Sequence, residues 1–326
     1  MPKQIKVTPL AEESLGVRSM CTYIETKDTK ILLDAGASLA PKRLGYPPHP
    51  KEYRALATCR KKIAEKAQKA DIITISHYHF DHHTPSYTDW FTNWSNPETA
   101  KQIYQNKLVL AKSYRSTVNA SQRRRGWLFS KGAGKHAKQI ESADGKTYQF
   151  AETSLKFSDP VFHGPENTEL GWLLMLTIEH ADEKVLFASD VQGPIHTPTL
   201  NQILAEKPQL LIIGGPPTYL AGFRVKEEHI QKGMQNLKTL AENIPTTILE
   251  HHTLRDEKWK NQTQPILDSA AQTGHKVLTA AEYSGTKNNP LEFRRRQLYE
   301  TEPPSPDFIK WLKLPLQKRK QQKPPI

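Results

Sequence analysis

The sequence has few cysteines and no long apolar run among its 326 residues. The two cysteines, Cys21 and Cys59, have no metal-like spacing and are too few for a disulfide framework, so a reduced environment is expected. No apolar stretch approaches the roughly 20 residues that span a bilayer, and residues 1–6 lack the apolar core of a secretory signal. We therefore expect a cytoplasmic protein without membrane contact.

Positive charge exceeds negative charge, and the excess lies in two segments. The chain carries 46 Lys and Arg against 34 Asp and Glu, a net charge of +12. Residues 84–150 hold 11 basic and 4 acidic residues, and residues 287–326 hold 10 and 4, so the remainder is close to neutral. This distribution favours an anionic partner, such as nucleic acid or a phosphorylated small molecule. Ordinary solubility charge is the alternative interpretation.

Short apolar runs alternate with helical patterns along the chain, which predicts an α/β fold. Strands are predicted over residues 30–34, 71–76, 107–111, 148–151, 155–158, 170–178, 184–188, 210–213 and 246–249. Helices are predicted over residues 52–70 and 226–243, while residues 121–129 fit either a capped helix start or a loop. The Pro- and Lys-rich end is predicted to pack at first and to become a loose end.

Four histidines and one aspartate fall within seven positions, directly after the predicted strand at 71–76. The segment reads His77-Tyr78-His79-Phe80-Asp81-His82-His83. Imidazole and carboxylate groups are ligands that suit zinc, iron or manganese, and a cluster this dense needs a partner to satisfy it. A solvated histidine-rich loop is the alternative.

Further polar residues follow other predicted strands. They are Asp34, His163, Asp190, His251 and His252. If these strands end at one edge of a layered α/β fold, that edge brings the side chains together. A single histidine after a strand is more often structural, but several in succession favour a site.

In this order the residues resemble the motifs of the metallo-β-lactamase-fold hydrolase superfamily, over roughly residues 1–285. Segments 76–83, 214–220 and 251–256 further resemble a mainly archaeal branch of predicted metal-dependent hydrolases. The resemblance implies a four-layer αβ/βα sandwich of two mixed sheets with outer helices. We expect a catalytic domain over residues 1–286, with residues 84–150 as a basic, aromatic-rich insertion at the site rim. A basic extension over residues 287–326 would follow.

The resemblance also implies a dinuclear centre, with two zinc ions expected and iron or manganese as alternatives. The residues that would hold the first ion are His77, His79 and His163. Those that would hold the second are Asp81, His82 and either His251 or His252, with Asp190 bridging both ions. His252 is the preferred ligand, and His251 would then face inward. Asp34 would orient ligands without touching metal, and His83 would be either a similar support or purely structural.

The implied reaction is hydrolysis by a bridging hydroxide at phosphorus or carbonyl carbon, with Asp81 positioning the nucleophile or accepting its proton. Candidate substrate contacts are Tyr219, Arg255, Arg123, Arg124 and Arg125. Basic groups interspersed with aromatic residues such as Trp90, Trp94 and Trp127 suit single-stranded nucleic acid, although helix packing and a solvated helix face are alternatives. We therefore favour a phosphodiesterase or nuclease. The alternatives are a hydrolase of small esters, lactones or thioesters, and a nucleic-acid-binding scaffold without catalysis.

Overall fold

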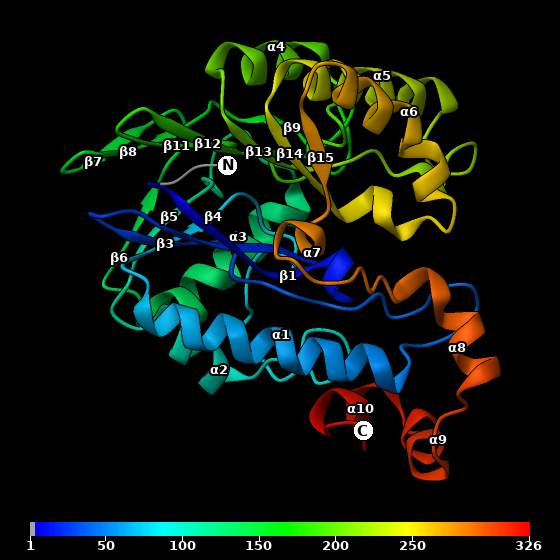
Figure 1. Ribbon diagram of the computed structural model, residues 1–326. Coiled ribbons are helices and arrows are strands. Elements are labelled where there is room, and N and C mark those ends of the chain that lie inside the picture. Colours follow the sequence, from blue (N-terminus) through cyan, green and yellow to red (C-terminus); the bar gives the residue numbers. More distant parts are fainter. Residues whose placement is uncertain (1–3) are drawn as a thin grey trace.

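Two mixed β-sheets lie face to face with helices on their outer sides in the computed structural model, which describes residues 4–326 (Figure 1). This arrangement confirms the four-layer αβ/βα sandwich predicted from the sequence.

The first sheet has six strands in chain order. They are β1 (Lys6–Glu12), β2 (Met20–Glu25), β3 (Lys30–Leu33), β4 (Ile72–Ile75), β5 (Leu108–Ala111) and β6 (Gln139–Ser142). The pairs from β1 to β3 are antiparallel and those from β3 to β6 are parallel. The helices associated with this sheet are α1 (Pro50–Lys69), α2 (Pro97–Tyr104) and α3 (Ala120–Lys131). Leu56 and Ile63 of α1 are buried with Ile73 of β4 in one apolar cluster, which joins the helix to the sheet.

The second sheet has seven strands in the order β15-β14-β13-β12-β11-β8-β7. Their bounds are β7 (Thr147–Phe150), β8 (Thr153–Phe157), β11 (Leu176–His180), β12 (Glu183–Phe187), β13 (Leu210–Gly214), β14 (Thr246–Glu250) and β15 (Lys276–Leu278). Its outer face carries α4 (Thr197–Glu206), α5 (Glu227–Asn243) and α6 (Trp259–Gln272) (Figure 1). A separate two-stranded ribbon pairs β9 (Val161–Phe162) with β10 (Trp172–Leu173).

Shorter elements complete the chain. They are the 3-10 helices η1 (Glu13–Leu15), η2 (Ala133–His136), η3 (Thr218–Leu220), η4 (His251–Arg255) and η5 (Glu292–Arg294), and the helices α7 (Ala280–Tyr283), α8 (Arg295–Thr301), α9 (Pro306–Leu312) and α10 (Leu316–Gln321). Within residues 4–326, no helix is both long and apolar enough to cross a membrane.

The central apolar layer lies between the sheets. Ile31 and Ile72 of the first sheet are buried in one cluster with Ile178, Ile212 and Ile248 of the second. Because β4 and β13 are buried along their whole length, they read as continuous apolar runs rather than alternating ones. This is why the sequence revealed these strands.

Residues 84–150, expected as a basic, aromatic-rich insertion at the site rim, contribute strands to both sheets. β5 and β6 extend the first sheet and β7 forms the edge of the second. The basic residues of this segment flank strands of the two sheets, and a count of charges alone does not distinguish such strands from an inserted segment.

The end of the chain is also packed rather than loose. The Trp311 indole donates a hydrogen bond to the carbonyl of Gln322, and the Lys323 ammonium lies 4.4 Å from the ring centroid of Trp90. The same ammonium lies 5.8 Å from the ring of Trp94. The aromatic faces of Trp90 and Trp94 are therefore contacted by the chain's own tail.

A buried ion pair fixes the C-terminal extension to α1. The guanidinium of Arg295 donates two hydrogen bonds, of 2.7 and 2.9 Å, to the carboxylate of Glu52, and both side chains are buried. We predict that Arg295→Met lowers the free energy of unfolding by about 3–5 kcal/mol, because Glu52 would keep a buried charge without its partner. Urea denaturation followed by circular dichroism measures this. The neighbouring exposed Arg296→Met is the control, and equal stability of the two variants would contradict the prediction.

Candidate metal centre

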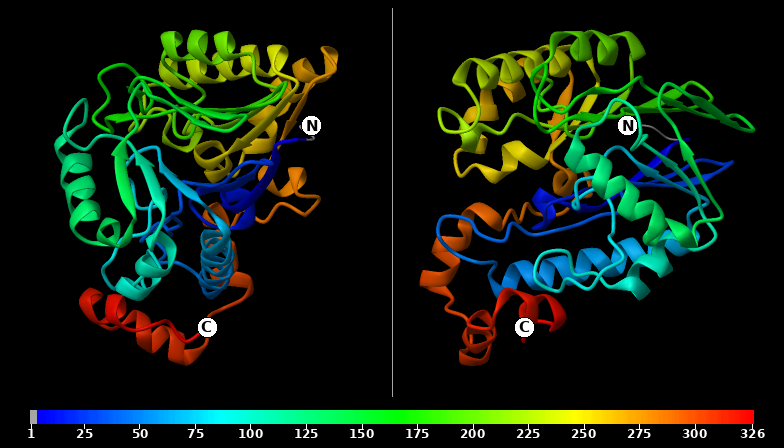
Figure 2. Two further views of the ribbon diagram at one scale, coloured as in Figure 1. Left: turned by 90° about the vertical axis from the view of Figure 1, so that its left-hand side faces the viewer. Right: turned by 180° about the vertical axis from the view of Figure 1, so that it is seen from behind.

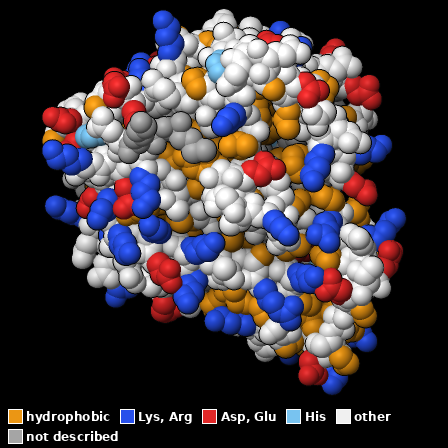
Figure 3. Space-filling view, in the orientation of Figure 1, with side chains coloured by type: hydrophobic (Ala, Val, Ile, Leu, Met, Phe, Trp, Pro, Cys, Tyr) orange, Lys and Arg blue, Asp and Glu red, His pale blue; other side chains and the backbone are white. Residues whose placement is uncertain are grey.

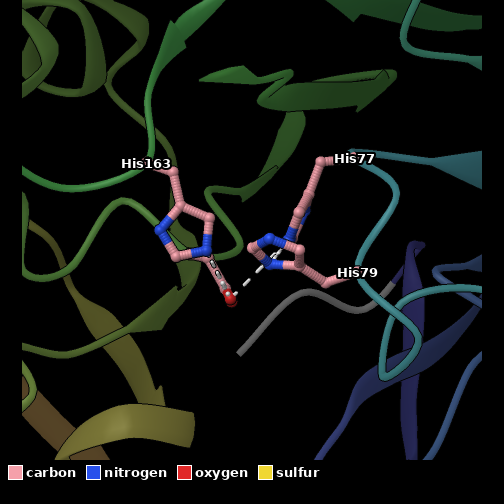
Figure 4. A group of neighbouring side chains, drawn as sticks. His77, His79 and His163 are labelled. Atoms are coloured by element: carbon pink, nitrogen blue, oxygen red, sulfur yellow. Dashed lines mark hydrogen bonds and ion pairs between the residues drawn. The ribbon is translucent and has the colours of Figure 1, made fainter. Parts of the chain in front are cut away.

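The polar residues that follow the strands meet at one edge of the two sheets. Asp34 follows β3, the His77–His83 segment follows β4, His163 follows β9, Asp190 lies just beyond β12, and His251 with His252 follows β14. Figure 4 shows the imidazoles of His77, His79 and His163 turned toward one another. The structure therefore brings together side chains from both halves of the chain, as the sequence predicted.

The first cluster consists of His77, His79, His163 and Asp190. Each residue offers one ligand atom, and the four atoms lie within 4.8 Å of one another. The Asp190 Oδ2 atom lies 3.1 Å from His163 Nε2 and 3.8 Å from His77 Nε2. This spacing can hold one metal ion.

The second cluster consists of Asp81, His82 and His251, whose ligand atoms also lie within 4.8 Å of one another. The same Asp190 Oδ2 atom lies 3.3 Å from the Nε2 atoms of both His82 and His251. One carboxylate oxygen therefore stands between the two clusters.

The two consecutive histidines after β14 are placed in the reverse of the expected order. His251 Nε2 lies 3.4 Å from Asp81 Oδ2, whereas His252 is grouped only with Asp190 and His251, with its Nε2 atom 3.7 Å from Asp190 Oδ2. The preference for His252 in the second cluster is thus not supported by this placement. The reason is local, because the backbone of His251 has a positive φ of 63° that redirects the chain at the end of the strand.

The donor set fits a metal. His82 Nε2, His163 Nε2 and Asp190 Oδ1 are buried and have no hydrogen-bond partner among the described residues. A buried polar atom without a partner costs about 1–3 kcal/mol. Divalent cations at these positions would satisfy all three atoms, and nitrogen and oxygen ligands of this kind suit zinc, iron or manganese.

Burial and charge set the ionisation of the ligands. Burial lowers the pKa of His77 well below its usual range and that of His79 to about 3, so both imidazoles are neutral and each has one nitrogen lone pair that a cation could accept. Burial by itself would raise the pKa of Asp190, but His251 and His82 hold it well below its usual value. For His82, burial is outweighed by Asp190 and Asp81, which raise its pKa well above normal. The two carboxylates thus require nearby positive charge, which divalent cations also supply.

Asp34 lies behind the candidate ligands and contacts His82 and Ser76. Its Oδ2 atom accepts hydrogen bonds from His82 Nδ1 at 2.8 Å and from the Ser76 hydroxyl at 2.5 Å, while Oδ1 accepts one from the Ser76 amide at 2.7 Å. Because Nδ1 of His82 is engaged by Asp34, its Nε2 atom faces the cluster. Partners of this kind orient ligand histidines and raise metal affinity.

Two further residues support the histidine loop. His83 Nδ1 lies 2.9 Å from the carbonyl oxygen of His79, and burial lowers the pKa of His83 to about 3. Gln122 of α3 is fully buried, accepts a hydrogen bond from the Tyr78 amide and donates one to the Leu170 carbonyl. The role of Gln122 was not predicted, because nothing in the sequence around a single glutamine signals it.

The predicted substrate contacts separate into three groups. Arg255 is only 3 % exposed and its Nε atom donates to Glu13 at 2.5 Å, so it lies behind His251 rather than open to a substrate, contrary to the expectation. Tyr219 is half-buried under the guanidinium of Arg43. Arg125 is half-buried over the ring of Phe80, next to Asp81, whereas Arg123 and Arg124 are exposed on another face of α3.

No family model matches the chain. The chain is 44% identical to a UPF0282 protein of Methanopyrus kandleri over 294 residues, which are 90% of this chain and 99% of that protein. It is 40% identical to a UPF0282 protein of Pyrobaculum islandicum over 297 residues, 91% of this chain and 95% of that protein.

Among solved structures, unliganded yeast PDE1 aligns with a TM-score of 0.51 at 10% identity, over 84% of this chain and 97% of that one. A metal-dependent hydrolase of the β-lactamase superfamily aligns with a TM-score of 0.46 at 12% identity, over 84% and 95%. These likenesses concern the fold alone, and the sandwich of two mixed sheets with outer helices agrees with the fold class expected from the sequence.

Asp190→Ala is predicted to remove most of the bound metal, because Asp190 Oδ2 is the oxygen shared by both clusters. Inductively coupled plasma mass spectrometry of the purified protein measures this. Asp182→Ala, an exposed carboxylate in the same part of the chain, is the matched control. Retention of two ions per chain in the Asp190 variant would overturn the bridging assignment.

The two histidines after β14 are separated by a second pair of variants. We predict that His251→Gln binds less metal than the wild-type protein, while His252→Gln binds as much, since only His251 lies within ligand distance of both Asp81 and His82. The same metal analysis, repeated after dialysis against a weak chelator, distinguishes them. Loss of metal from His252→Gln but not from His251→Gln would instead identify His252 as the ligand.

Proposed function

The chain belongs to the UPF0282 family, and from its candidate metal centre we propose that it is a dinuclear metal-dependent hydrolase whose substrate is a phosphodiester, nucleic acid being favoured. One observation carries the proposal. The single oxygen Asp190 Oδ2 lies within 3.8 Å of imidazole nitrogens from both ligand clusters. A shared carboxylate of this kind is what two neighbouring cations require.

The proposed ligands of the first ion are His77, His79, His163 and Asp190, and those of the second are Asp81, His82, His251 and Asp190. Zinc is the expected ion, with iron or manganese as alternatives. When bound, divalent ions would make water acidic enough to supply hydroxide near neutral pH and would polarise the bond to be cleaved. Their four positive charges exceed the two negative charges of Asp81 and Asp190, so the loaded site favours an anionic substrate.

Asp81 is the carboxylate best placed to handle a proton. Its side chain is 15 % exposed, whereas those of Asp190 and His251 are 2 % and 0 % exposed. Asp81 can therefore reach a water molecule that attacks from the open side, orient it and take up its proton. Asp34 supports the same reaction indirectly, because it fixes the ring of His82.

Arg125 supports an anionic substrate. Its guanidinium lies 4.9 Å from the ring centroid of Phe80, and Phe80 and Asp81 are both partly exposed. Burial lowers the pKa of Arg125 while Asp81 raises it, and an arginine remains cationic at neutral pH. A guanidinium at this position can donate to two phosphate oxygens at once.

The proposal predicts hydrolysis of bis(p-nitrophenyl) phosphate that requires bound metal and Arg125. We expect Arg125→Met to raise the KM for this diester by about 10- to 150-fold, since a charge-assisted hydrogen bond is worth about 1.5–3 kcal/mol. Hydrolysis of the neutral p-nitrophenyl acetate should not change. Lys131→Met removes the same charge from an exposed position at the end of α3 and is the control.

Two outcomes of this experiment would contradict the proposal. Metal-loaded protein that cleaves the acetate, lactones or thioesters but no diester would be an ester hydrolase. Metal-loaded protein inert toward every compound would be a scaffold without catalysis. If the substrate is a nucleic acid, its turnover at low substrate concentration should fall steeply as the salt concentration rises.

A further inference from the structure

A groove of about 670 Å³ lies along α3, apart from the proposed ligands. It is lined by Tyr114, Arg115, Ala120, Arg123, Arg124 and Trp127. We infer that this groove binds single-stranded nucleic acid and holds a polymeric substrate beside the metal centre. The inference deepens the proposed function and rests on it for the cleavage step, but not for binding.

The charge of the groove is uncompensated. Arg115, Arg123 and Arg124 are exposed, no carboxylate lines the groove, and none of the three forms an ion pair within residues 4–326. By contrast, Arg18 and Arg295 are each paired with a glutamate. On the face shown in Figure 3, basic and acidic side chains are mixed. A groove with cations alone suits a ligand with repeated negative charge.

The groove also offers open aromatic surface. The guanidinium carbon of Arg115 lies 5.5 Å from the ring centroid of Tyr114. Trp127 is 49% exposed. This differs from Trp90 and Trp94, whose rings are contacted by Lys323. A flat, exposed indole among arginines can stack on a base while the cations contact phosphates. In a duplex the base faces are already stacked, so the combination selects single strands over duplexes and over acidic peptides.

The spacing of the lining residues shows that the groove runs along one face of the helix. Ala120, Arg123, Arg124 and Trp127 recur at helical intervals, and α3 lies at the outer side of the molecule (Figure 2). The opposite face of α3 is buried. A phosphodiester chain laid in the groove therefore follows the helix rather than crossing the protein at one point.

The buried face of α3 joins the groove to the metal centre. Gln122 holds Tyr78, which lies between His77 and His79, and it also holds Leu170 of the loop that follows His163. A Cβ atom added at Gly126 would lie 2.4 Å from Tyr114 Cβ and 2.8 Å from the Tyr78 ring, so only glycine permits this approach. Arg125 continues the positive charge toward Phe80. A strand longer than the groove can thus reach the site over the same helix.

Fluorescence anisotropy of a labelled, phosphorothioate-linked oligothymidylate of about twelve nucleotides tests the inference on the full-length, metal-loaded protein. Arg123→Gln combined with Arg124→Gln should weaken binding by about tenfold or more. It should also reduce the slope of log K against log salt by about 1.4, because two phosphate contacts are lost. Trp127→Ala should weaken binding by about 5- to 100-fold, and Trp127→Phe should restore most of it.

Lys61→Gln combined with Lys62→Gln is the matched control, since it removes two exposed positive charges from α1. The inference is overturned if this control weakens binding as much as the arginine pair, or if Trp127→Ala binds normally. The inference would also be overturned if a duplex of the same oligonucleotide bound with equal affinity, or if polyglutamate displaced the labelled strand as strongly as unlabelled oligothymidylate does.

The binding test and the test of the proposed function fail separately. If the wild-type protein cleaves the small diester but does not bind the oligothymidylate, the hydrolase function stands and nucleic-acid binding in the groove is refuted. If the protein binds the single strand through Trp127 but cleaves no diester, nucleic-acid binding in the groove stands and the phosphodiesterase function is refuted.

Discussion

The arrangement of this site depends on one carboxylate, Asp190, placed among buried imidazoles. Its Oδ2 atom lies 3.1 to 3.8 Å from the Nε2 atoms of five histidines. A charge this deeply buried is tolerated only where compensating charge or hydrogen bonds surround it. Because the five imidazoles come from three different loops, the same requirement aligns the carboxyl ends of strands from both sheets.

Behind these residues, a second layer of buried polar groups holds the ligands in place. Asp34 ties His82 to Ser76 on the side of the first sheet. On the opposite side, Arg255 contacts Glu13 and lies 3.7 Å from Asp81. Glu13 belongs to η1 near the start of the chain, so the N-terminal segment closes the back of the site. The centre is therefore a property of the whole sandwich rather than of the histidine motif.

The helix α3 connects the site with the basic character of the chain. Its buried face supports both ligand loops through Gln122, one flank carries Arg125 toward Phe80, and its outward face bears unpaired arginines beside Trp127. The basic tail differs from α3 because its charges contact the protein itself. Lys323 and Arg319 lie over aromatic rings of residues 90–94. Two segments with similar charge counts thus play different roles, one open to solvent and one folded back on the protein.

The sequence by itself indicated the buried strands β3, β4, β5, β12, β13 and β14, the polar residues that follow several of them and the set of ligand candidates, whereas β1, β2, β6, β9 and β15 were not predicted. Buried parallel strands must be continuously apolar, and a polar residue directly after such a strand has nowhere to lie but the sheet edge. Only the tertiary structure decided which of His251 and His252 turns toward Asp81, that Arg255 is buried against Glu13, and that β5 to β7 belong to the sheets. These outcomes depend on a single backbone angle or on contacts between residues far apart in the chain, and neither leaves a periodic pattern that a sequence can display.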